Sequence, residues 1–581
     1  MTVLNYYDIF QDEQPLPLDV YLTGVSKAQL QKITSYFLGI DFRTSHLNNW
    51  RELLQMWFRG ENHEFAKVIW GRCEQLEKEI GTITFLREAA FLKFFEFTRI
   101  FIDGEEQIDD ITSERNLFIA YLLFVSQTTD KERLSVEYIE NLPEKERFAA
   151  LLLNQQFAYG EYSNVQLADV FKAQLVKAAY LFLFLENNQR ANYLLIAFCA
   201  FYNLKNWREF FRFVVPIIQA HSIHPKGGGW THLDVTKDEN FQKNCFFLES
   251  LSQEVDIESD FRSTRTNPLY KVDTGIFGIV YPLFVVEKIF KGSYFKLKEL
   301  NDSIPDLGET IKKISDWRGF YTGHFSESIL LYHVLEHIYG KRSYLQFSGD
   351  ALKNIDKNGP PDYYIRNGNV IFLFENKDVH INGEIRQSYD FEKLEQALKS
   401  KLYFDTEIRN NGTLKERARA VKQLINNVMK ILLKQNQYDT NYKEHNIKIY
   451  PIIVLHDTSF ECPGLNCLLN CWFDQELVKL NVDGITTKNV KQITIVNIDT
   501  LIIYADFLKE KMQKLNILID EYIKHSTFMQ KNKPQTREEI IEAFSGTFEP
   551  FSVFIDKFTN TGHLKIKSQL ADAMFKTIVN A

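Results

Sequence analysis

Residues 360–378, PPDYYIRNGNVIFLFENKD, constrain the fold of this chain more than any other stretch. Two runs rich in aromatic and β-branched residues, 363–365 and 370–374, flank the triplet Asn-Gly-Asn at 367–369. Aromatic and β-branched residues favour strands, while Asn and Gly tolerate the positive φ angles of a tight turn. The stretch therefore predicts a β-hairpin.

The turn of this hairpin determines which side chains face each other across the two strands. With residues 368–369 in the turn, Asp362 lies directly opposite Glu375. With residues 367–368 in the turn, Glu375 becomes the diagonal neighbour of Asp362. Because side chains alternate with a period of two along a strand, both registers place Asp362, Glu375 and Lys377 on one face. Two carboxylates and one ammonium thus converge at one end of the hairpin.

Such a cluster suits a particular chemistry. Two neighbouring carboxylates repel each other and need a cation, and hard oxygen ligands select Mg²⁺ or Mn²⁺. A lysine beside a bound metal can hold or deprotonate a water molecule and can stabilise charge that develops on a phosphate. The alternative interpretation is an exposed hairpin end that carries a surface ion pair.

The spacing of these residues is similar to that of a known family. Pro361-Asp362 is followed, after a gap of twelve residues, by Glu375-Asn376-Lys377. This pattern resembles the PD-(D/E)xK nuclease superfamily, over roughly 323–508. The resemblance implies a restriction-endonuclease-like αβββαβ core and metal-dependent hydrolysis of phosphodiester bonds. Asp362 and Glu375 would then bind Mg²⁺ or Mn²⁺, and Lys377 would orient the attacking water or act as its base.

A helix is predicted before the hairpin, in SESILLYHVLEHIYG at 326–340, with Ser at its start and Gly at its end. Glu327 leads the apolar stripe of this helix, whereas Glu336 points to the opposite face. In the superfamily the corresponding helix often supplies an acidic residue to the metal site. The resemblance assigns this role to Glu327, with Asp350 as a reserve candidate. The alternative is a glutamate favoured by the dipole at a helix start.

Two helices are predicted after the hairpin, at 391–404 and 413–435, and the second opens with a capping box of Thr413 and Glu416. From residue 399 to residue 434, nine basic residues stand against three acidic ones, although the net charge of the chain is −8. The excess favours a phosphate-contacting face, and a solvated helix face is the alternative. The basic residues are Lys399, Lys401, Arg409, Lys415, Arg417, Arg419, Lys422, Lys430 and Lys434, of which Lys415, Arg417, Arg419 and Lys422 are the candidate nucleic-acid contacts.

The remaining core elements complete the αβββαβ order. We predict strands at 343–350 and 447–457, and a strand followed by a helix within 491–510. Gln423 lies beside the apolar stripe of the helix at 413–435 and is a further catalytic candidate. Some branches of the superfamily place a helix glutamine near the active site, with a tyrosine four residues later. Asn427 stands at that later position here, which departs from the family pattern.

The N-terminal part of the chain predicts helices. Their apolar positions recur at spacings of three and four, and their succession suggests an irregular helical repeat that could act as a sensor or a scaffold. The clearest segments are 50–58, 85–101, 117–125, 168–186 and 191–204.

These patterns predict a multidomain chain. We expect an all-α domain at 1–250 and a connecting α/β segment at 251–322, with one or two strands plus a short helix at 275–297. The nuclease domain would cover 323–510, and a helical C-terminal extension would cover 511–581.

Two clusters of metal-ligating residue types stand outside the hairpin. His221, His224 and His232 lie in a glycine-rich stretch at 221–234, which we interpret as a polar loop near the end of the helical domain. Another cluster, Cys462, Cys467 and Cys471 with His456 upstream, follows the strand at 447–457. The resemblance allows an iron–sulfur cluster here, and zinc is conceivable. Core packing is the alternative, because two cysteines at i and i+4 also suit a buried helix face.

Composition narrows the classes of protein. The net charge of −8 excludes a molecule that binds polyanions over its whole surface. Six cysteines in 581 residues are too few for a disulfide framework. The first residues, MTVLNYYDIFQDEQ, do not resemble a secretory signal, and no apolar run reaches the roughly 20 residues of a bilayer span. We therefore expect a cytoplasmic protein without membrane contact.

The sequence thus predicts a Mg²⁺-dependent nuclease, with DNA favoured over RNA as substrate, and the resemblance suggests a role in microbial defence or restriction. The expected partners are nucleic acid, a protein or ligand trigger on the helical domain, and a second copy of the chain in a homodimer. The alternatives are a catalytically inactive nucleic-acid-binding module and a helical interaction scaffold.

Overall fold

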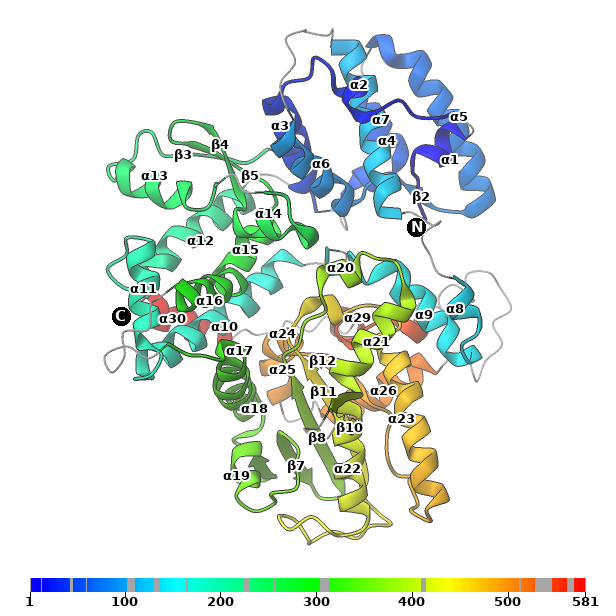
Figure 1. Cartoon of the computed structure of the whole chain (residues 1–581), viewed down its shortest axis with the longest axis vertical. Coiled ribbons are helices and arrows are strands. Elements are labelled where there is room, and N and C mark those ends of the chain that lie inside the picture. The colour runs from blue at the N-terminus through cyan, green and yellow to red at the C-terminus, as the bar shows by residue number, and fades with distance from the viewer. Residues whose placement is uncertain are drawn as a thin grey trace. The chain divides into compact units, whose positions relative to one another are not determined.

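The fold is known from a computed structural model of the chain. The residues that it describes are 2–11, 13–41, 45–58, 60–101, 110–129, 136–162, 166–223, 230–253, 256–303, 313–408, 414–510, 514–527, 546–561 and 569–579. The chain is mostly helical, with 63% helix, and carries a mixed five-stranded sheet interspersed with helices in its C-terminal half (Figure 1). An α/β region is therefore present, as predicted.

By their internal contacts the residues form two compact units. The first unit comprises Met1–Glu132, Tyr162–Gln174 and Asn192–Ser303, and the second comprises Arg133–Glu161, Leu175–Ala191 and Ile304–Ala581. These ranges differ from the expected domains at two points. Residues 133–161 and 175–191 belong to the second unit, and most of the expected connecting segment belongs to the first.

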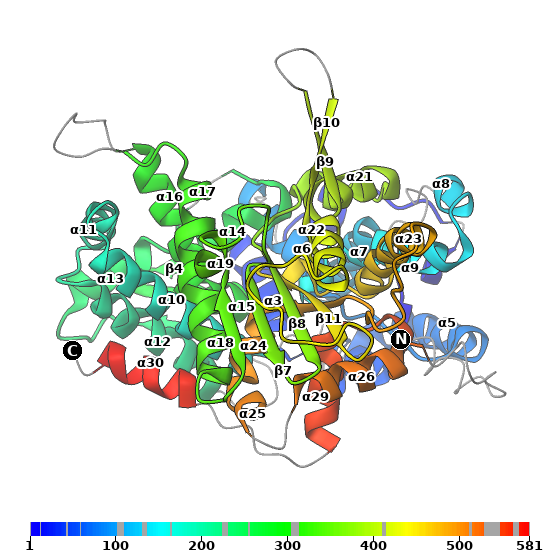
Figure 2. The same cartoon turned by 90° about the horizontal axis from the view of Figure 1, so that it is seen from below.

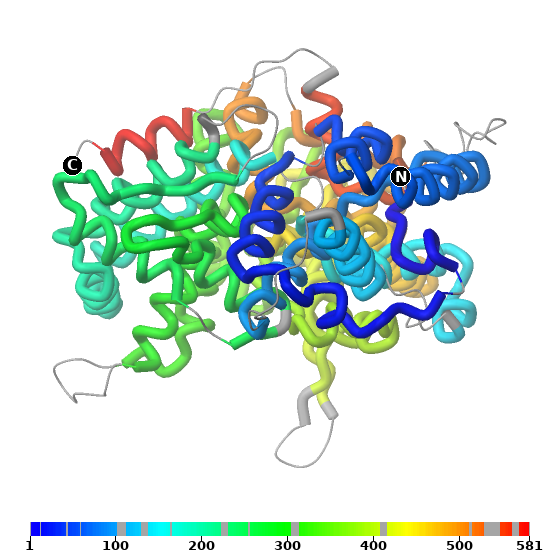
Figure 3. The backbone as a smooth tube through the Cα atoms, turned by 90° about the horizontal axis from the view of Figure 1, so that it is seen from above, coloured from blue at the N-terminus to red at the C-terminus, as the bar shows by residue number. Residues whose placement is uncertain are grey.

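The first unit consists largely of helices that follow one another along the backbone (Figure 3). The helices predicted at 50–58, 85–101, 117–125 and 191–204 are present. Aromatic stacking supports the core, because the rings of Phe91 and Tyr121 lie 4.1 Å apart. The helices are α1 (Tyr6–Phe10), α2 (Leu18–Leu22), α3 (Lys27–Leu38), α4 (Trp50–Trp57), α5 (His63–Ile80), α6 (Glu88–Ile100), α7 (Asp110–Thr129), α11 (Asn192–Phe201), α12 (Trp207–Ile223), α13 (Phe241–Glu249), α14 (Arg262–Thr266), α15 (Pro282–Glu287), the π-helix η5 (Lys288–Gly292) and α16 (Ser293–Ser303).

The expectation that residues 1–250 are purely helical is wrong. Strands β1 (Thr2–Val3) and β2 (Ile83–Thr84) pair in parallel, and β3 (His232–Asp234), β5 (Ile276–Ile279) and β4 (Leu269–Asp273) form an antiparallel sheet in that order. Backbone pairing between distant segments produces these short strands, and local helix periodicity does not reveal it. Strand β5 and helix α15 agree with the strand and short helix predicted within 275–297.

The five-stranded sheet of the second unit contains the predicted hairpin. Its order is β12-β11-β8-β7-β6, with β6, β7 and β8 antiparallel and β8, β11 and β12 parallel. Tyr363 pairs with Phe374 and Asn367 with Val370, so the turn consists of residues 368–369, the first of the two registers considered. The strands are β6 (Leu345–Ser348), β7 (Tyr363–Asn367), β8 (Val370–Lys377), β11 (Lys448–Leu455) and β12 (Thr494–Asn497).

Helices surround this sheet. Apolar side chains of β7 and β8, including Tyr364 and Leu373, pack into one buried cluster with Leu424 and Val428 of α22. The helices are α8 (Val136–Glu140), α9 (Glu144–Gln156), the second part of α10 (Leu167–Asn187), α17 (Trp317–Phe320), the π-helix η6 (Tyr321–Leu331), α18 (Tyr332–Tyr339), α19 (Gly349–Lys353), α20 (Gly383–Arg386), α21 (Phe391–Leu402), α22 (Ala420–Leu432), α23 (Leu465–Val482), α24 (Ile498–Ile503), α25 (Ala505–Lys509), α26 (Leu515–Ser526), α29 (Phe551–Thr561) and α30 (Gln569–Val579).

The helix predicted at 326–340 begins earlier than expected. Helical structure starts at Trp317, where the Asp316 side chain accepts a hydrogen bond from the Gly319 N–H, and it continues through the π-helix η6 into α18. Ser326 therefore lies within a helix and is not its start. The prediction failed because Asp316 is an equally good cap and lies farther upstream.

The first part of the helix predicted at 413–435 is a strand. Residues 414–418 form β10 (Leu414–Ala418), which pairs antiparallel with β9 (Phe404–Ile408) in a ribbon that projects beyond α21 (Figure 2). The backbone of Arg419 is extended, and α22 begins only at Ala420. The predicted capping box is thus wrong for Glu416, and Thr413 lies outside the described residues. Pairing with β9 overrides the helix propensity of Leu-Lys-Glu-Arg-Ala.

Within the described ranges, none of the helices combines the length and the apolar content that a membrane crossing requires.

Candidate active site

The hairpin brings the predicted triad together. Asp362 directly precedes β7, and the pairing of Tyr363 with Phe374 places it beside Glu375, near the end of β8. Lys377 Nζ lies 2.5 Å from Glu375 Oε1, and the Asn376 N–H donates a 2.7 Å hydrogen bond to Asp362 Oδ2. Two carboxylates and one ammonium therefore occupy one end of the hairpin.

Burial and charge shift the pKa of each group in this triad. Burial, and then the charge of Glu375, raises the pKa of Asp362 well above its usual value. Burial also raises the pKa of Glu375, against the opposing effect of Lys377. For Lys377, burial acts to lower the pKa, but the charges of Glu375 and Asp362 outweigh it and the pKa is raised. The lysine is therefore an ammonium at neutral pH.

Within the described part of the chain, a buried oxygen atom of Glu375 lacks a hydrogen-bond donor. Glu375 is only 1% exposed, and among the described residues nothing donates a hydrogen bond to its Oε2. A buried carboxylate oxygen without a donor is costly, and a bound cation is one way to satisfy it. The donor set of Asp362 and Glu375 therefore fits a hard divalent cation.

Glu327 is a third carboxylate of this site. It lies in the π-helix η6 with its side chain 16% exposed, and its charge raises the pKa of both Asp362 and Glu375. Its Oε1 accepts hydrogen bonds of 3.0 Å from both the Tyr332 hydroxyl and Lys353 Nζ. The structure thus brings Glu327 close to the hairpin, as the resemblance implied, whereas Glu336 is exposed on α18.

Lys353 is a site residue that the sequence analysis missed. It lies at the end of α19, and its charge lowers the pKa of Glu375, although burial has the larger effect. Lys353 Nζ also lies 3.4 Å from Asp350 Oδ1, and Asp350 Oδ2 accepts a 2.8 Å hydrogen bond from the Ser328 hydroxyl. No motif marks Lys353, and only its proximity in space to Glu327 reveals it.

Two lysines form ion pairs with carboxylates of this site, Lys353 with Glu327 and Lys377 with Glu375. In the part of the chain that is described, no group of three or more His, Cys, Asp and Glu side chains is arranged to hold a metal ion. Glu327, Asp362 and Glu375 are therefore not arranged as a three-residue metal site in this structure, and neither are His221, His232 and the cysteines. His224 lies outside the described residues. A metal at the hairpin would have to displace Lys353 or Lys377 from its carboxylate.

The predicted nucleic-acid contacts lie in and beside the β9–β10 ribbon. Arg417 stands opposite Asp405 in the β9–β10 ribbon, Arg419 Nη2 lies 2.8 Å from Asp405 Oδ2, and Lys422 forms an ion pair with Glu416. Lys415 is exposed and stands opposite Glu407 in the register. The strongest charge effects on Asp362 and Glu375 come instead from the residues of the hairpin, from Glu327 and, at Glu375, from Lys353.

The basic excess around the ribbon is reduced by ion pairs. Lys399 pairs with Glu395 at 2.9 Å, and Lys430 with Asp356 at 2.8 Å. Lys434 pairs with Glu444, Lys401 is exposed in the last turn of α21, and Arg409 lies outside the described residues. Gln423 is half-buried in α22, where its backbone carbonyl accepts a 3.0 Å hydrogen bond from Asn427. The contacts of Gln423 do not connect it to the triad.

No family model, curated protein or solved structure matches this chain. Any function must therefore be argued from the residues of the site.

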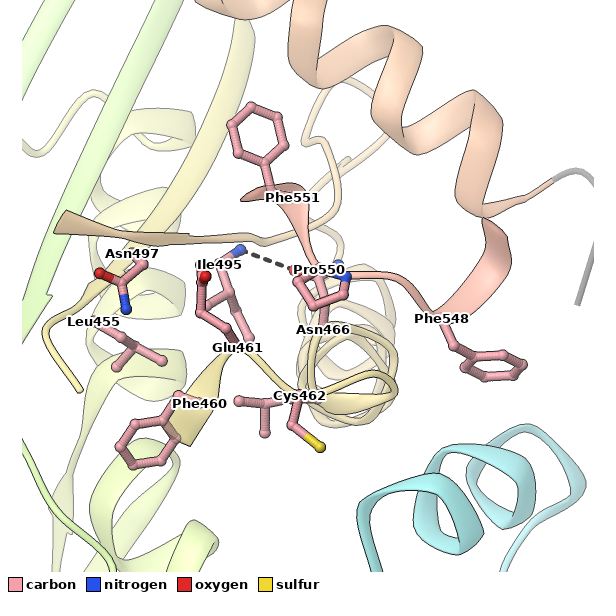
Figure 4. A pocket seen from close by; sticks show the side chains of 11 residues that line it. Leu455, Phe460, Glu461, Cys462, Asn466, Ile495, Asn497, Phe548, Pro550 and Phe551 are labelled. Atoms are coloured by element: carbon pink, nitrogen blue, oxygen red, sulfur yellow. Dashed lines mark hydrogen bonds between the residues drawn. The ribbon is translucent and has the colours of Figure 1, made fainter. Parts of the chain in front are cut away.

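A pocket elsewhere in the second unit holds none of these carboxylates. It lies where β11 and β12 end against α23 and the start of α29, and most of its lining is apolar (Figure 4). Cys462 lines it and is buried in the core, while Cys467 and Cys471 lie on α23. Glu461 is the charged residue of its lining, and burial raises the pKa of this carboxyl to about 7.

Proposed function

We propose that this chain is a metal-dependent nuclease of the PD-(D/E)xK type, which hydrolyses phosphodiester bonds. One observation carries the proposal: Asp362 and Glu375 form a carboxylate pair with raised pKa values beside Lys377, and a buried oxygen of Glu375 lacks a donor. A structural ion pair would need one carboxylate for one lysine. The excess of negative charge supports a cation site instead.

The arrangement of elements supports a restriction-endonuclease-like core. The helical segment from α17 to α18 precedes β6, β7 and β8, helices α21 and α22 follow, and β11 then joins β8 in parallel. This succession agrees with an αβββαβ core into which the short helices α19 and α20 and the β9–β10 ribbon are inserted.

Asp362, Glu375 and Glu327 would hold the metal, with Mg²⁺ or Mn²⁺ preferred by their oxygen ligands. A bound divalent cation supplies the lowered pKa of a coordinated water and offsets charge on the phosphate. Lys377, as an ammonium with a raised pKa, would hold the attacking water by a hydrogen bond and stabilise negative charge on the phosphate. Its protonation favours this role over that of a general base.

DNA remains the proposed substrate on the strength of the resemblance, with a role in microbial defence or restriction and a trigger on the helical first unit. Lys415 and Arg417, exposed on β10, are the proposed backbone contacts of the ribbon. The acidic residues at 405, 407 and 416 of the same ribbon reduce its net charge, so further phosphate contacts must come from other surfaces.

Cleavage assays test this proposal. Purified wild-type protein and the variant Lys377→Ala are incubated with double-stranded DNA, single-stranded DNA and RNA, in Mg²⁺, Mn²⁺ or EDTA. Lys393→Ala is the matched control, because Lys393 is an exposed lysine of α21 outside the site. We expect metal-dependent cleavage that falls by about 100-fold or more in Lys377→Ala and is unchanged in the control.

A second candidate function is a nucleic-acid-binding module without catalysis. The pairing of Lys353 with Glu327 and of Lys377 with Glu375 favours it, since these lysines neutralise the carboxylates without a metal. Calorimetric titration with Mn²⁺ separates the two candidates. Binding by the wild type that is lost in Asp362→Ala supports the nuclease, and the absence of binding and of cleavage contradicts it.

A further inference from the structure

The end of β8 has two faces with different partners. Because side chains alternate along a strand, Glu375 and Lys377 lie on one face, and Asn376 and Asp378 lie on the other. The first face is the proposed active site. The second face contacts a buried polar network that the proposed reaction does not use.

His456, which directly follows β11, is the centre of this network. Its side chain is 6% exposed, and its Nε2 lies 2.7 Å from Asn376 Oδ1. The Ser326 hydroxyl lies 3.4 Å from its Nδ1 and 3.3 Å from its Nε2. A neutral imidazole satisfies Asn376, because its Nε2–H can donate to the amide oxygen, while the Ser326 hydroxyl contacts both ring nitrogens at similar distances. Burial, which lowers the pKa of His456 to about 4, agrees with the neutral form.

The charged groups around His456 are already paired. Asp378 Oδ2 lies 3.8 Å from His456 Nδ1, but Arg318 Nη2 lies 2.7 Å from the other oxygen of Asp378. Lys177 and Asp499, the other charges that act on His456, lie 2.6 Å apart. His456 is therefore held by hydrogen bonds to neutral groups and does not serve as a counter-ion.

The two neutral partners belong to the segments that carry the proposed site. Asn376 lies between Glu375 and Lys377, and its N–H donates the 2.7 Å hydrogen bond to Asp362 Oδ2. Ser326 directly precedes Glu327 in η6. One buried imidazole thus connects the strand end that bears two site residues with the helix that bears the third carboxylate.

We propose that His456 is a positioning residue of the proposed metal site, which fixes the end of β8, with Asp362 and Glu375 beside it, relative to η6, which carries Glu327. This inference rests on the proposed nuclease function. It assigns to a residue outside the motif the role of aligning ligands that come from distant parts of the chain. Changing a group that orients metal ligands from behind typically lowers metal affinity by about 10–100-fold.

Two substitutions at position 456 separate positioning from space filling. His456→Gln keeps an amide N–H that can reach Asn376, whereas His456→Leu keeps the volume but removes the hydrogen bonds. Calorimetric titration with Mn²⁺ and the kcat and KM of DNA cleavage are measured for both, with thermal unfolding as a check of folding. We expect the Leu variant to bind Mn²⁺ about 10–100-fold more weakly, with reduced kcat and little change in KM. The Gln variant should stay within about 3-fold of wild type.

Ser326→Ala gives an independent test should His456→Leu fail to fold, because it removes a single hydroxyl next to Glu327. The expected loss of Mn²⁺ affinity is about 5-fold, the equivalent of one hydrogen bond. A wild-type protein that binds Mn²⁺ and cleaves DNA, with His456→Leu and Ser326→Ala equal to it, overturns the positioning role alone. A wild-type protein that neither binds Mn²⁺ nor cleaves overturns the nuclease and the positioning role together.

Discussion

Lys353 Nζ lies 3.0 Å from Glu327 Oε1, so a lysine of the short helix α19 neutralises the carboxylate proposed as the third metal ligand. The Lys353 side chain is 54% exposed, which leaves the ion pair open to solvent and to ions. Such pairs are weak, typically about 0.2–1 kcal/mol. A divalent cation that binds Glu327 can therefore displace Lys353.

Removing this competing charge should strengthen metal binding. We expect Lys353→Gln to raise the affinity for Mn²⁺ by up to about 5-fold, because the metal ion no longer has to displace the Lys353 ammonium from Glu327. Calorimetric titration measures the change. Lys357→Gln is the matched control, since Lys357 is an exposed lysine just beyond α19. Unchanged or weaker binding in Lys353→Gln would show that Glu327 is not a ligand.

The substitution Asp362→Asn should weaken metal binding and stabilise the folded protein. The pKa of Asp362 is raised in the folded protein, so its ionisation lowers stability as the pH rises above its unfolded pKa of about 3.9. Asparagine removes this charge and can still accept the Asn376 N–H. Without metal we expect a gain of about 1 kcal/mol at pH 8, smaller at pH 5, in chemical denaturation. Mn²⁺ affinity should fall at least about 10-fold. Reduced stability at pH 8 would contradict the raised pKa.

The titration of His456 should contribute to acid unfolding. Its folded pKa of about 4 lies below the usual value of 6.5, so the unfolded chain binds the proton first as the pH falls. This contribution to stability is present above pH 6.5 and is lost between pH 6.5 and 4. From pH 7 to pH 5, wild type should lose about 2 kcal/mol more than His456→Gln. Parallel stability curves for the two proteins would contradict a buried neutral histidine.

The titration of Glu461, which lines the pocket of Figure 4, should lower the stability of the folded protein as the pH rises. Burial raises its pKa to about 7, although hydrogen bonds from Ser552 and Thr500 oppose the shift. The folded protein holds this proton more tightly than the unfolded chain, so stability falls as the pH rises from about 4.5 to 7. Glu461→Gln should therefore stabilise the protein at pH 8 by about 1–2 kcal/mol and have little effect at pH 4.5. Glu392→Gln, on the exposed face of α21, is the control, and an equal effect in both variants would contradict the assignment.

The hairpin was predictable because its information is local. The alternation of apolar residues and the Asn-Gly-Asn turn left two registers. The structure adopts the register with residues 368–369 in the turn, where Gly368 has a φ of 60°. Both registers placed Asp362, Glu375 and Lys377 on one face, so the triad did not depend on the choice.

The errors arose where local signals competed with distant partners. Residues 414–418 have good helix propensity, but they pair with β9, which no periodicity within 413–435 reveals. Ser326 is a good helix cap by residue type, yet Asp316 caps the helix instead and places Ser326 inside η6, where it reaches His456. A correct start at Asp316 would have suggested an interior role for Ser326.

The sequence by itself determined which chemical groups converge at the hairpin, because the two-residue period of a strand and a short turn bring Asp362, Glu375 and Lys377 to one end of one face. Only the tertiary structure decided what surrounds them. Glu327 lies in η6, Lys353 ends α19, and His456 directly follows the parallel strand β11. Only the packing of those elements brings the three residues to β8. Their burial and mutual charges, which set the pKa values of the site, exist only in the folded chain.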